Sequence, residues 1–206
     1  MDSAVSQLCG QIRACTICRD TPRKIPLPHA PRPVIRATST ARLCIAGQAP
    51  GTRVHASGLP FDDPSGERLR DWMAIDRSAF YDERRLAIVP MGFCFPGLDA
   101  KGGDLPPRTE CRDTWHDQVF AAMPQLELIL VIGQYAQAYH LGKARKKSLT
   151  ETVKNWETYW HSDETGCRYL PLPHPSWRNT GWLKKNPWFA EDVLPVLRSE
   201  VARLIS

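Results

Sequence analysis

Four short runs of apolar residues stand out in the hydrophobic pattern of this chain. They cover residues 42–47, 86–89, 128–132 and 168–172. Apolar runs of this length, bounded by turn residues, are typical of strands that are buried on both faces. We therefore expect four strands, of which Leu128 to Ile132 is the longest uninterrupted apolar run.

Between these runs, apolar residues recur at intervals of three or four, which predicts amphipathic helices. The helical sets are Val5, Leu8, Ile12 and Cys15; Leu69, Trp72 and Met73, after an N-cap expected at Ser65; Trp115, Val119, Phe120 and Met123; and Phe189, Val193, Leu197, Val201 and Leu204. Strands that alternate with helices predict a three-layer α/β/α sandwich around a mostly parallel four-stranded sheet. Ligands of such sheets bind beyond the carboxyl ends of the strands.

The first 41 residues differ from the remainder in composition. Five prolines lie between residues 22 and 33, and they predict an extended tether over the surface of the domain. With 206 residues, we expect one domain over 1–206. Its core covers 42–206, and 1–41 supplies a helix, a cysteine pair and the tether.

Composition and charge exclude several classes of protein. A hydrophobic fraction of 42% with 24% charged residues is unlike a disordered chain or a coiled coil. The net charge of +5 suits a polyanionic partner without requiring one. The acidic, polar start resembles no signal peptide, and no apolar run has membrane-spanning length. We expect a cytoplasmic monomer with no membrane contact.

The seven cysteines predict thiols or metal ligands, because an odd number without an export signal does not favour disulfides. Cys15 and Cys18 are spaced so that both thiolates reach one metal from a single turn. Cys94 and Cys111 form a second pair. Four thiolates do not select the metal, so an iron–sulfur cluster, zinc and no metal all remain open. Cys44, inside a predicted strand, is expected in the core.

Two motifs follow the ends of predicted strands, and two further short segments lie between them. The first motif is Gly47-Gln48-Ala49-Pro50-Gly51; Gly58-Leu59-Pro60-Phe61 and Pro64-Ser65-Gly66 follow it, and the second motif, His174-Pro175-Ser176, comes after the last strand. Each alone is typical of an ordinary tight turn. In combination they resemble the uracil-DNA glycosylase superfamily, from about Arg42 to the end of the last helix.

The resemblance implies a specific chemistry. The target nucleotide is flipped out of the stack, its ring is stacked on an aromatic side chain, and its edge is hydrogen-bonded. Cleavage of the N-glycosidic bond leaves a uracil anion, so a donor at the pyrimidine oxygen stabilises the developing charge. The resemblance assigns the donor to His174 and the stacking ring to Phe61. It places the backbone of the first motif, Gly47, Ala49, Pro50 and Gly51, against the base.

Two departures from the family pattern affect this site. Some branches of the family carry Ala at the position of Ala49, where others carry Asp, and these branches usually read Gly-Glu-Ala-Pro-Gly. Gln48 replaces that Glu here and so removes a charge. The group that activates water is therefore open among Gln48, His55, Asp62 and Asp63.

Pro90 stands where that branch usually places the Asn that reads uracil, and its side chain forms no hydrogen bond. Main-chain groups at Met91 and Gly92, or the side chain of Asn179, are the expected substitutes.

The resemblance also implies DNA contacts. The loop after the second motif enters the duplex as a wedge and carries Trp177, Arg178 and Asn179, with Ser176, Ser65 and Gly66 as further contacts. An equally good alternative is that Trp177 packs against Trp182 and Trp188. Basic residues cluster in a run, Lys143, Arg145, Lys146 and Lys147, and again after the wedge, at Lys184 and Lys185.

The cysteines add a second resemblance, to the iron–sulfur branch of the same superfamily. That branch holds a [4Fe-4S] cluster with an N-terminal CxxC and a later pair that flanks a Pro-rich loop, here with Pro96, Pro106 and Pro107. It implies Cys15, Cys18, Cys94 and Cys111 as ligands. Zinc or no metal are the alternatives.

The sequence thus predicts a uracil-DNA glycosylase that acts on uracil-containing DNA, releases uracil and leaves an abasic site. We expect no strand cleavage, because neither motif contains a Lys to form a Schiff base. Two other functions remain open. One is a protein that binds or traps uracil or abasic DNA with little turnover, and the other is a metal-stapled nucleic-acid-binding module.

Overall fold

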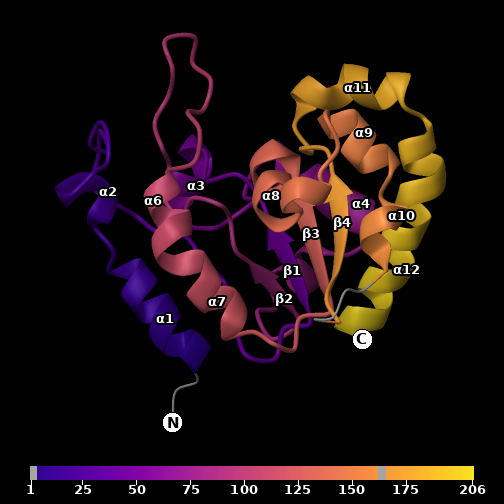
Figure 1. Cartoon of the computed structure of the whole chain (residues 1–206), viewed down its shortest axis with the longest axis horizontal. Coiled ribbons are helices and arrows are strands. Elements are labelled where there is room, and N and C mark those ends of the chain that lie inside the picture. Colours follow the sequence, from indigo (N-terminus) through magenta and orange to yellow (C-terminus); the bar gives the residue numbers. More distant parts are fainter. Residues whose placement is uncertain (1–3, 162–165) are drawn as a thin grey trace.

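The computed structural model describes residues 4–161 and 166–206, and a single parallel sheet lies at its centre (Figure 1). Its strands are β1 (Leu43–Ala46), β2 (Leu86–Ile88), β3 (Leu128–Ile132) and β4 (Arg168–Leu172). The strand order is β2-β1-β3-β4, and all neighbours are parallel. The predicted four-stranded parallel sheet is confirmed.

The strands start almost level with one another. Leu43 of β1 pairs with Leu86 on one side and with Leu128 on the other, and Leu128 pairs with Arg168 of β4. Because all four strands run the same way, their carboxyl ends meet at one edge of the sheet.

Side chains of the strands alternate between two buried clusters. In β1, Cys44 and Ala46 join a cluster with α1 (Ala4–Arg13), α7 (Asp117–Ala121) and α8 (Gly133–His140). Leu43 and Ile45 join the opposite cluster, with α4 (Pro64–Met73), α9 (Leu149–Lys154) and α12 (Leu194–Ile205). Figure 1 shows α1 and α7 on one side of the sheet and α12 on the other. This is the predicted three-layer sandwich.

The remaining helical segments are short. They are α2 (Ile17–Asp20), α3 (Thr52–Ser57), α5 (Arg77–Phe80), α6 (Thr109–Cys111), α10 (Glu157–Trp160) and α11 (Thr180–Lys185), with 3₁₀ turns at Gly142–Ala144 and Trp177–Asn179 and π-type turns at Arg112–His116 and Phe189–Val193. In the part of the chain that the structure describes, no helix combines the length and apolarity needed to cross a bilayer.

Two details of the predicted helices need correction. The N-cap of α4 is Asp63, not Ser65: the Asp63 carboxylate accepts the Gly66 amide at 2.8 Å. Pro64 occupies the first helical position, where its missing N–H leaves nothing unpaired. On α1 the buried face is formed by Val5, Cys9 and Ile12, while Leu8 is only half-buried; Cys15 lies beyond the end of this helix.

The tether is less superficial than predicted. Leu27, Val34, Ile35 and Ala37 are buried, and all but Val34 pack with the α1 side of the sheet. Arg36 and Ile88 exchange backbone hydrogen bonds of 3.1 and 2.7 Å, so the tether pairs antiparallel with β2. The apolar residues between and after the prolines are therefore used to cover the free edge of the sheet.

Candidate functional site

A cavity of about 150 Å³ opens at the carboxyl ends of the strands. A cavity of this size accommodates a single six-membered ring. Its walls come from segments following β1, β2 and β4 and from two further loops. The lining residues are Val34, Gly47, Gln48, Ala49, Pro50, Gly51, Val54, Pro60, Phe61, Asp63, Ser65, Ile88, Pro90, Asp104, His174 and Ser176. The two motifs predicted to form the site therefore meet at one cavity.

Phe61 forms one wall and has an unusual backbone conformation. Its φ of +56° lies in the left-handed region, which is costly for an aromatic residue and is found mainly at functional sites. A Cβ on Gly47 would lie 3.4 Å from the ring, so the ring packs directly over the start of the first motif. Phe61 and Phe80 form a T-shaped pair with ring centroids 6.0 Å apart. The Phe61 ring is thus held in place beside the cavity.

Several groups maintain this conformation. A side chain at Gly66 would overlap the Phe61 carbonyl, so glycine is required there. Tyr81 donates a hydrogen bond to the Pro60 carbonyl at 2.8 Å, and Arg70 donates to the Phe61 carbonyl at 3.4 Å. Gly66, expected to contact DNA, is instead buried under Phe61. The only sequence signal for Arg70 was a cation among the apolar residues of α4.

His174 forms another wall, and its hydrogen bonds define its tautomer. The Ser176 amide donates to Nδ1 at 3.2 Å, so the proton of the neutral ring lies on Nε2. Burial lowers the pKa of His174, and the nearby charge of Asp63 only partly opposes this. At neutral pH the ring is therefore an uncharged donor through Nε2.

The loop that carries His174 is fixed to the rest of the site. Asn179 donates through Nδ2 to the His174 carbonyl at 2.7 Å, and so has a structural contact in place of the predicted base contact. Arg68, on α4, donates to the Ser176 carbonyl at 2.9 Å and to Thr180 Oγ1 at 3.2 Å. Since α4 begins just after Phe61, Arg68 connects the two sides of the cavity. No motif or periodicity in the sequence marked Arg68.

The four candidates for water activation separate into two groups. Gln48 and Asp63 line the cavity. Asp62 lies outside it, in an ion pair with Arg77 at 2.9 Å. His55 also lies outside the lining and packs against His29, with ring centroids 4.2 Å apart. The hypothesis that His55 or Asp62 acts on water at this site has no geometric support.

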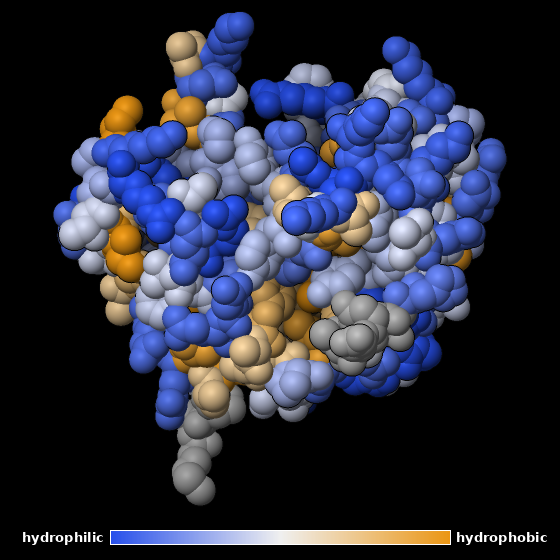
Figure 2. All heavy atoms as spheres, viewed as in Figure 1, coloured by the Kyte–Doolittle hydropathy of each residue, from blue (hydrophilic) through white to orange (hydrophobic). Residues whose placement is uncertain are grey.

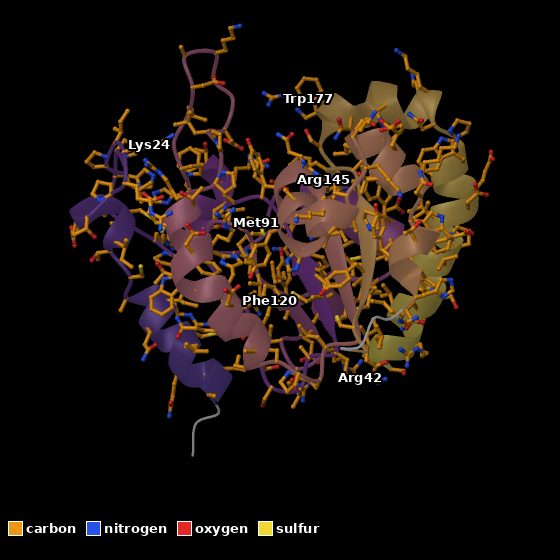
Figure 3. All side chains as sticks on the ribbon, viewed as in Figure 1. Lys24, Arg42, Met91, Phe120, Arg145 and Trp177 are labelled. Atoms are coloured by element: carbon orange, nitrogen blue, oxygen red, sulfur yellow. The ribbon has the colours of Figure 1, made fainter. Side chains whose placement is uncertain are left out.

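The main-chain groups expected to replace the uracil-reading Asn already form hydrogen bonds within the protein. Pro90 lines the cavity, and its carbonyl lies 2.9 Å from Nε2 of the buried His116. The amides of Met91 and Gly92 donate to the carbonyls of Gly47 and Gln48 at 2.9 and 3.0 Å. These amides hold the first motif against the segment that follows β2 and are not available to a base, and Met91 lies in the interior (Figure 3).

Asp104 is a lining residue that was not among the predicted site residues. It comes from the loop between β2 and α6, which rises away from the sheet (Figure 1). A Cβ on Gly51 would lie 3.5 Å from Oδ2 of Asp104, which places the carboxylate over the first motif. The pKa of Asp104 is raised by burial and by Asp63 and Asp99, while Arg178 opposes this. No periodicity or family motif marks an acid within a Gly- and Pro-rich loop.

Trp177 lies at the outer edge of the site. It is 71% exposed, and the Arg178 guanidinium lies 5.8 Å from the centre of its ring. Figure 3 shows Trp177 at the end of the molecule from which the 96–108 loop projects. Trp182 and Trp188 instead pack on each other, with ring centroids 5.7 Å apart. The alternative in which Trp177 packs against these two residues is wrong.

Exposed basic residues share this end of the molecule. Arg145 donates to the Gln134 carbonyl in the first turn of α8, which follows the carboxyl end of β3. Its neighbours Lys143, Lys146 and Lys147 are exposed, as are Lys184 and Lys185 of α11. Figure 2 shows mostly hydrophilic residues over this end. Such a surface suits a phosphate backbone.

The four predicted ligand cysteines also meet. Cys15, Cys18, Cys94 and Cys111 line a second cavity, with Ile12, Pro31, Pro33 and Phe93. The sulfur atoms of Cys18 and Cys111 lie 4.0 Å apart, and burial raises the pKa of Cys94 to about 12. All seven cysteines are free thiols, and Cys44 is in the core as expected.

The cysteine cavity is not arranged around one ion. Within residues 4–161 and 166–206, no three His, Cys, Asp or Glu side chains converge on one ion position. The four thiols nevertheless surround a common space. Four thiols are a donor set that suits either a structural zinc ion or an iron–sulfur cluster.

Comparison with known protein families gives one finding for this chain. A family model described as the uracil DNA glycosylase superfamily matches residues 35–198. The matched residues include both motifs, Asp104, Cys94 and Cys111, and begin after Cys15 and Cys18.

Proposed function

Because the chain belongs to the uracil-DNA glycosylase superfamily, we propose that it excises uracil from DNA and leaves an abasic site. Membership supports a DNA glycosylase-type hydrolase that binds DNA and acts in its repair. The choice of uracil is our proposal. It rests on one observation: a cavity sized for one ring is lined by both Phe61 and the donor His174.

Binding requires that the target base leave the helix. A flipped pyrimidine enters the cavity and stacks on Phe61, and such stacking contributes about 1–3 kcal/mol per base. Trp177 is exposed next to the cavity and is placed to occupy the gap left in the duplex. The surrounding basic residues bind phosphates. The left-handed backbone conformation of Phe61 fixes the position of its ring in the absence of DNA.

The chemical step is separation of C1′ from N1 of the base. As the bond breaks, its electron pair moves onto the uracil ring and charge develops on the pyrimidine oxygens. His174 donates through Nε2 to one of these oxygens, because the Ser176 amide occupies Nδ1. A neutral donor that is already oriented stabilises this charge without reorganisation in the transition state.

The cysteine cavity has a structural role in this proposal. Cys15, Cys18, Cys94 and Cys111 would hold a [4Fe-4S] cluster, which when bound cross-links the N-terminal segment to the loop before α6. His116 connects the two cavities: Nδ1 lies 3.3 Å from the Cys111 carbonyl and Nε2 lies 2.9 Å from the Pro90 carbonyl. Fixing the position of Cys111 would therefore also stabilise Pro90, which lines the base cavity.

One gel assay tests the proposed function against the alternatives. Incubation with a uracil-containing oligonucleotide, followed by alkali, should cleave the strand at the uracil position only. A band shift that survives denaturant, without cleavage, would indicate covalent trapping. A salt-sensitive shift without cleavage would indicate a nucleic-acid-binding module. The same oligonucleotide with thymine in place of uracil is the matched control.

A further inference from the structure

The reaction needs a group that prepares water, and the first motif supplies no acid. Ala49 and Gln48 carry no charge. Hydrolysis of the N-glycosidic bond passes through a cationic sugar, as in other glycoside hydrolases, and a carboxylate normally stabilises that cation or activates the water. In this chain the carboxylate has to come from another segment.

We propose that Asp104 is this carboxylate, and that it binds and deprotonates the water that attacks C1′. The inference rests on the proposed function. Asp104 lines the cavity and lies over Gly51, next to the wall formed by the first motif. Its outer side is exposed, so water reaches it directly from solvent.

The backbone on either side of Asp104 is held firmly. The Leu105 amide donates to the Gly97 carbonyl at 2.9 Å, and Leu98 and Asp104 form an antiparallel bridge. At the tip, the Asp99 carboxylate accepts the amides of Lys101 and Gly103 at 2.8 and 2.9 Å. These bonds let an irregular loop present one carboxylate at a defined place.

The other acid at the cavity is already engaged. Asp63 accepts the Gly66 amide through Oδ1 as the cap of α4. No described residue donates a hydrogen bond to the carboxylate of Asp104, which leaves both oxygens for water. Asp63 and Asp99 raise the pKa of Asp104 and Arg178 lowers it, with burial as the largest effect. A raised pKa makes a carboxylate a better base, since it lies nearer the working pH.

The step balances without a further reactant. The C1′–N1 bond breaks, and both electrons leave with the uracil anion, which His174 stabilises. The water oxygen bonds to C1′, and the water proton passes to an oxygen of Asp104. Uracil then takes a proton from solvent after release, and Asp104 returns its proton to solvent.

The rate of single-turnover excision by the wild type and by three Asp→Asn variants tests this assignment. Asp104→Asn should slow excision by about 10²-fold, because general base catalysis contributes at least that much. Its affinity for an abasic duplex should be equal or higher, since a negative charge near phosphates is removed. Asp63→Asn keeps a good helix cap and should have a smaller effect. Asp71→Asn, an exposed acid on α4, should match the wild type.

The pH profile separates catalysis from a structural effect. Asp104 must be ionised and His174 must be neutral, with Nδ1 free to accept from the Ser176 amide, so the logarithm of the rate should fall in acid with a limiting slope of about two for wild type and about one for Asp104→Asn. Asp104→Glu, which keeps the charge, should recover part of the rate even if Asp104→Asn folds poorly.

The outcomes distinguish the two proposals. Wild-type protein that excises no uracil overturns the proposed function and this assignment together. Active wild type with Asp104→Asn within about three-fold overturns Asp104 alone, as does a large loss confined to Asp63→Asn.

Discussion

The base cavity and the cysteine cavity are built from different kinds of structure. The base cavity lies where β1, β2 and β4 end, and paired main-chain hydrogen bonds align these ends. The cysteine cavity lies between α1, α2, the tether and the segments that carry Cys94 and Cys111, and none of its lining residues belongs to a strand. One cavity is thus a consequence of the sheet, and the other joins segments that the sheet does not align.

This difference indicates what each cavity requires to exist. The base cavity needs no ligand, because the sheet, α4 and the Arg68 contacts hold its walls. Three of the four thiols at the cysteine cavity are buried and that of Cys15 is half-buried, and the sulfur atoms of Cys18 and Cys111 lie 4.0 Å apart. A metal cluster would add a direct connection between these segments, since binding energy at such a site contributes to folding. Loss of the cluster should therefore affect folding, and changes in the base cavity should affect the reaction.

The largest effect is expected at the cysteine cavity. Protein purified without oxygen should be brown and contain about four irons per chain. Cys94→Ser should remove the iron and reduce the yield of soluble protein far more than the activity of each folded molecule. Cys9→Ser, on α1 but outside the cavity, should keep the iron. A colourless, fully folded wild-type protein with neither iron nor zinc would contradict this prediction.

The next effect is expected at His174. His174→Ala removes a donor to the leaving base and should slow single-turnover excision by about 10²–10³-fold, while binding to an abasic duplex is nearly unchanged. Because burial lowers the pKa of His174, the wild-type rate should stay flat as pH falls through the ordinary histidine range and decline only in more acidic solution. A normal rate for His174→Ala, with activity lost on replacing Gln48, would move the chemistry to the first motif.

A smaller effect is expected at Phe61. Phe61→Leu keeps an apolar side chain against Phe80 and loses the flat ring. Since base stacking contributes about 1–3 kcal/mol, affinity for uracil-containing DNA should fall by roughly 5- to 150-fold, with the melting temperature nearly constant. Fluorescence anisotropy and thermal melting measure the two quantities. A large drop in melting temperature with normal catalysis per folded molecule would show that Phe61 serves core packing.

The smallest effect is expected at Asp63. Asp63→Ala removes the cap of α4 and should cost about 1 kcal/mol of the free energy of unfolding, whereas Asp63→Asn should cost little, because Asn caps equally well. Urea unfolding measures both. Equal losses for Ala and Asn would indicate that the negative charge, and not the hydrogen bond to Gly66, stabilises this region.

Local patterns predicted most of the framework correctly. All four strands lie where their apolar runs predicted, and the tail residues Phe189, Val193, Leu197, Val201 and Leu204 are all buried. The superfamily was also recognisable, since its motifs are contiguous and each turn needs particular residues. The errors lie where local rules compete: Ser65 was a plausible cap, but Pro64 at the first helical position assigns that role to Asp63.

The sequence by itself determined the periodicities, the order of strands and helices and the residue types in each motif, because these depend on neighbours within one or two turns. Only the tertiary structure decided which of these residues share a cavity. It separated His55 and Asp62 from Gln48 and Asp63, and added Asp104 from a loop far along the chain. Such contacts depend on strand register and loop path, which arise when distant segments pack together.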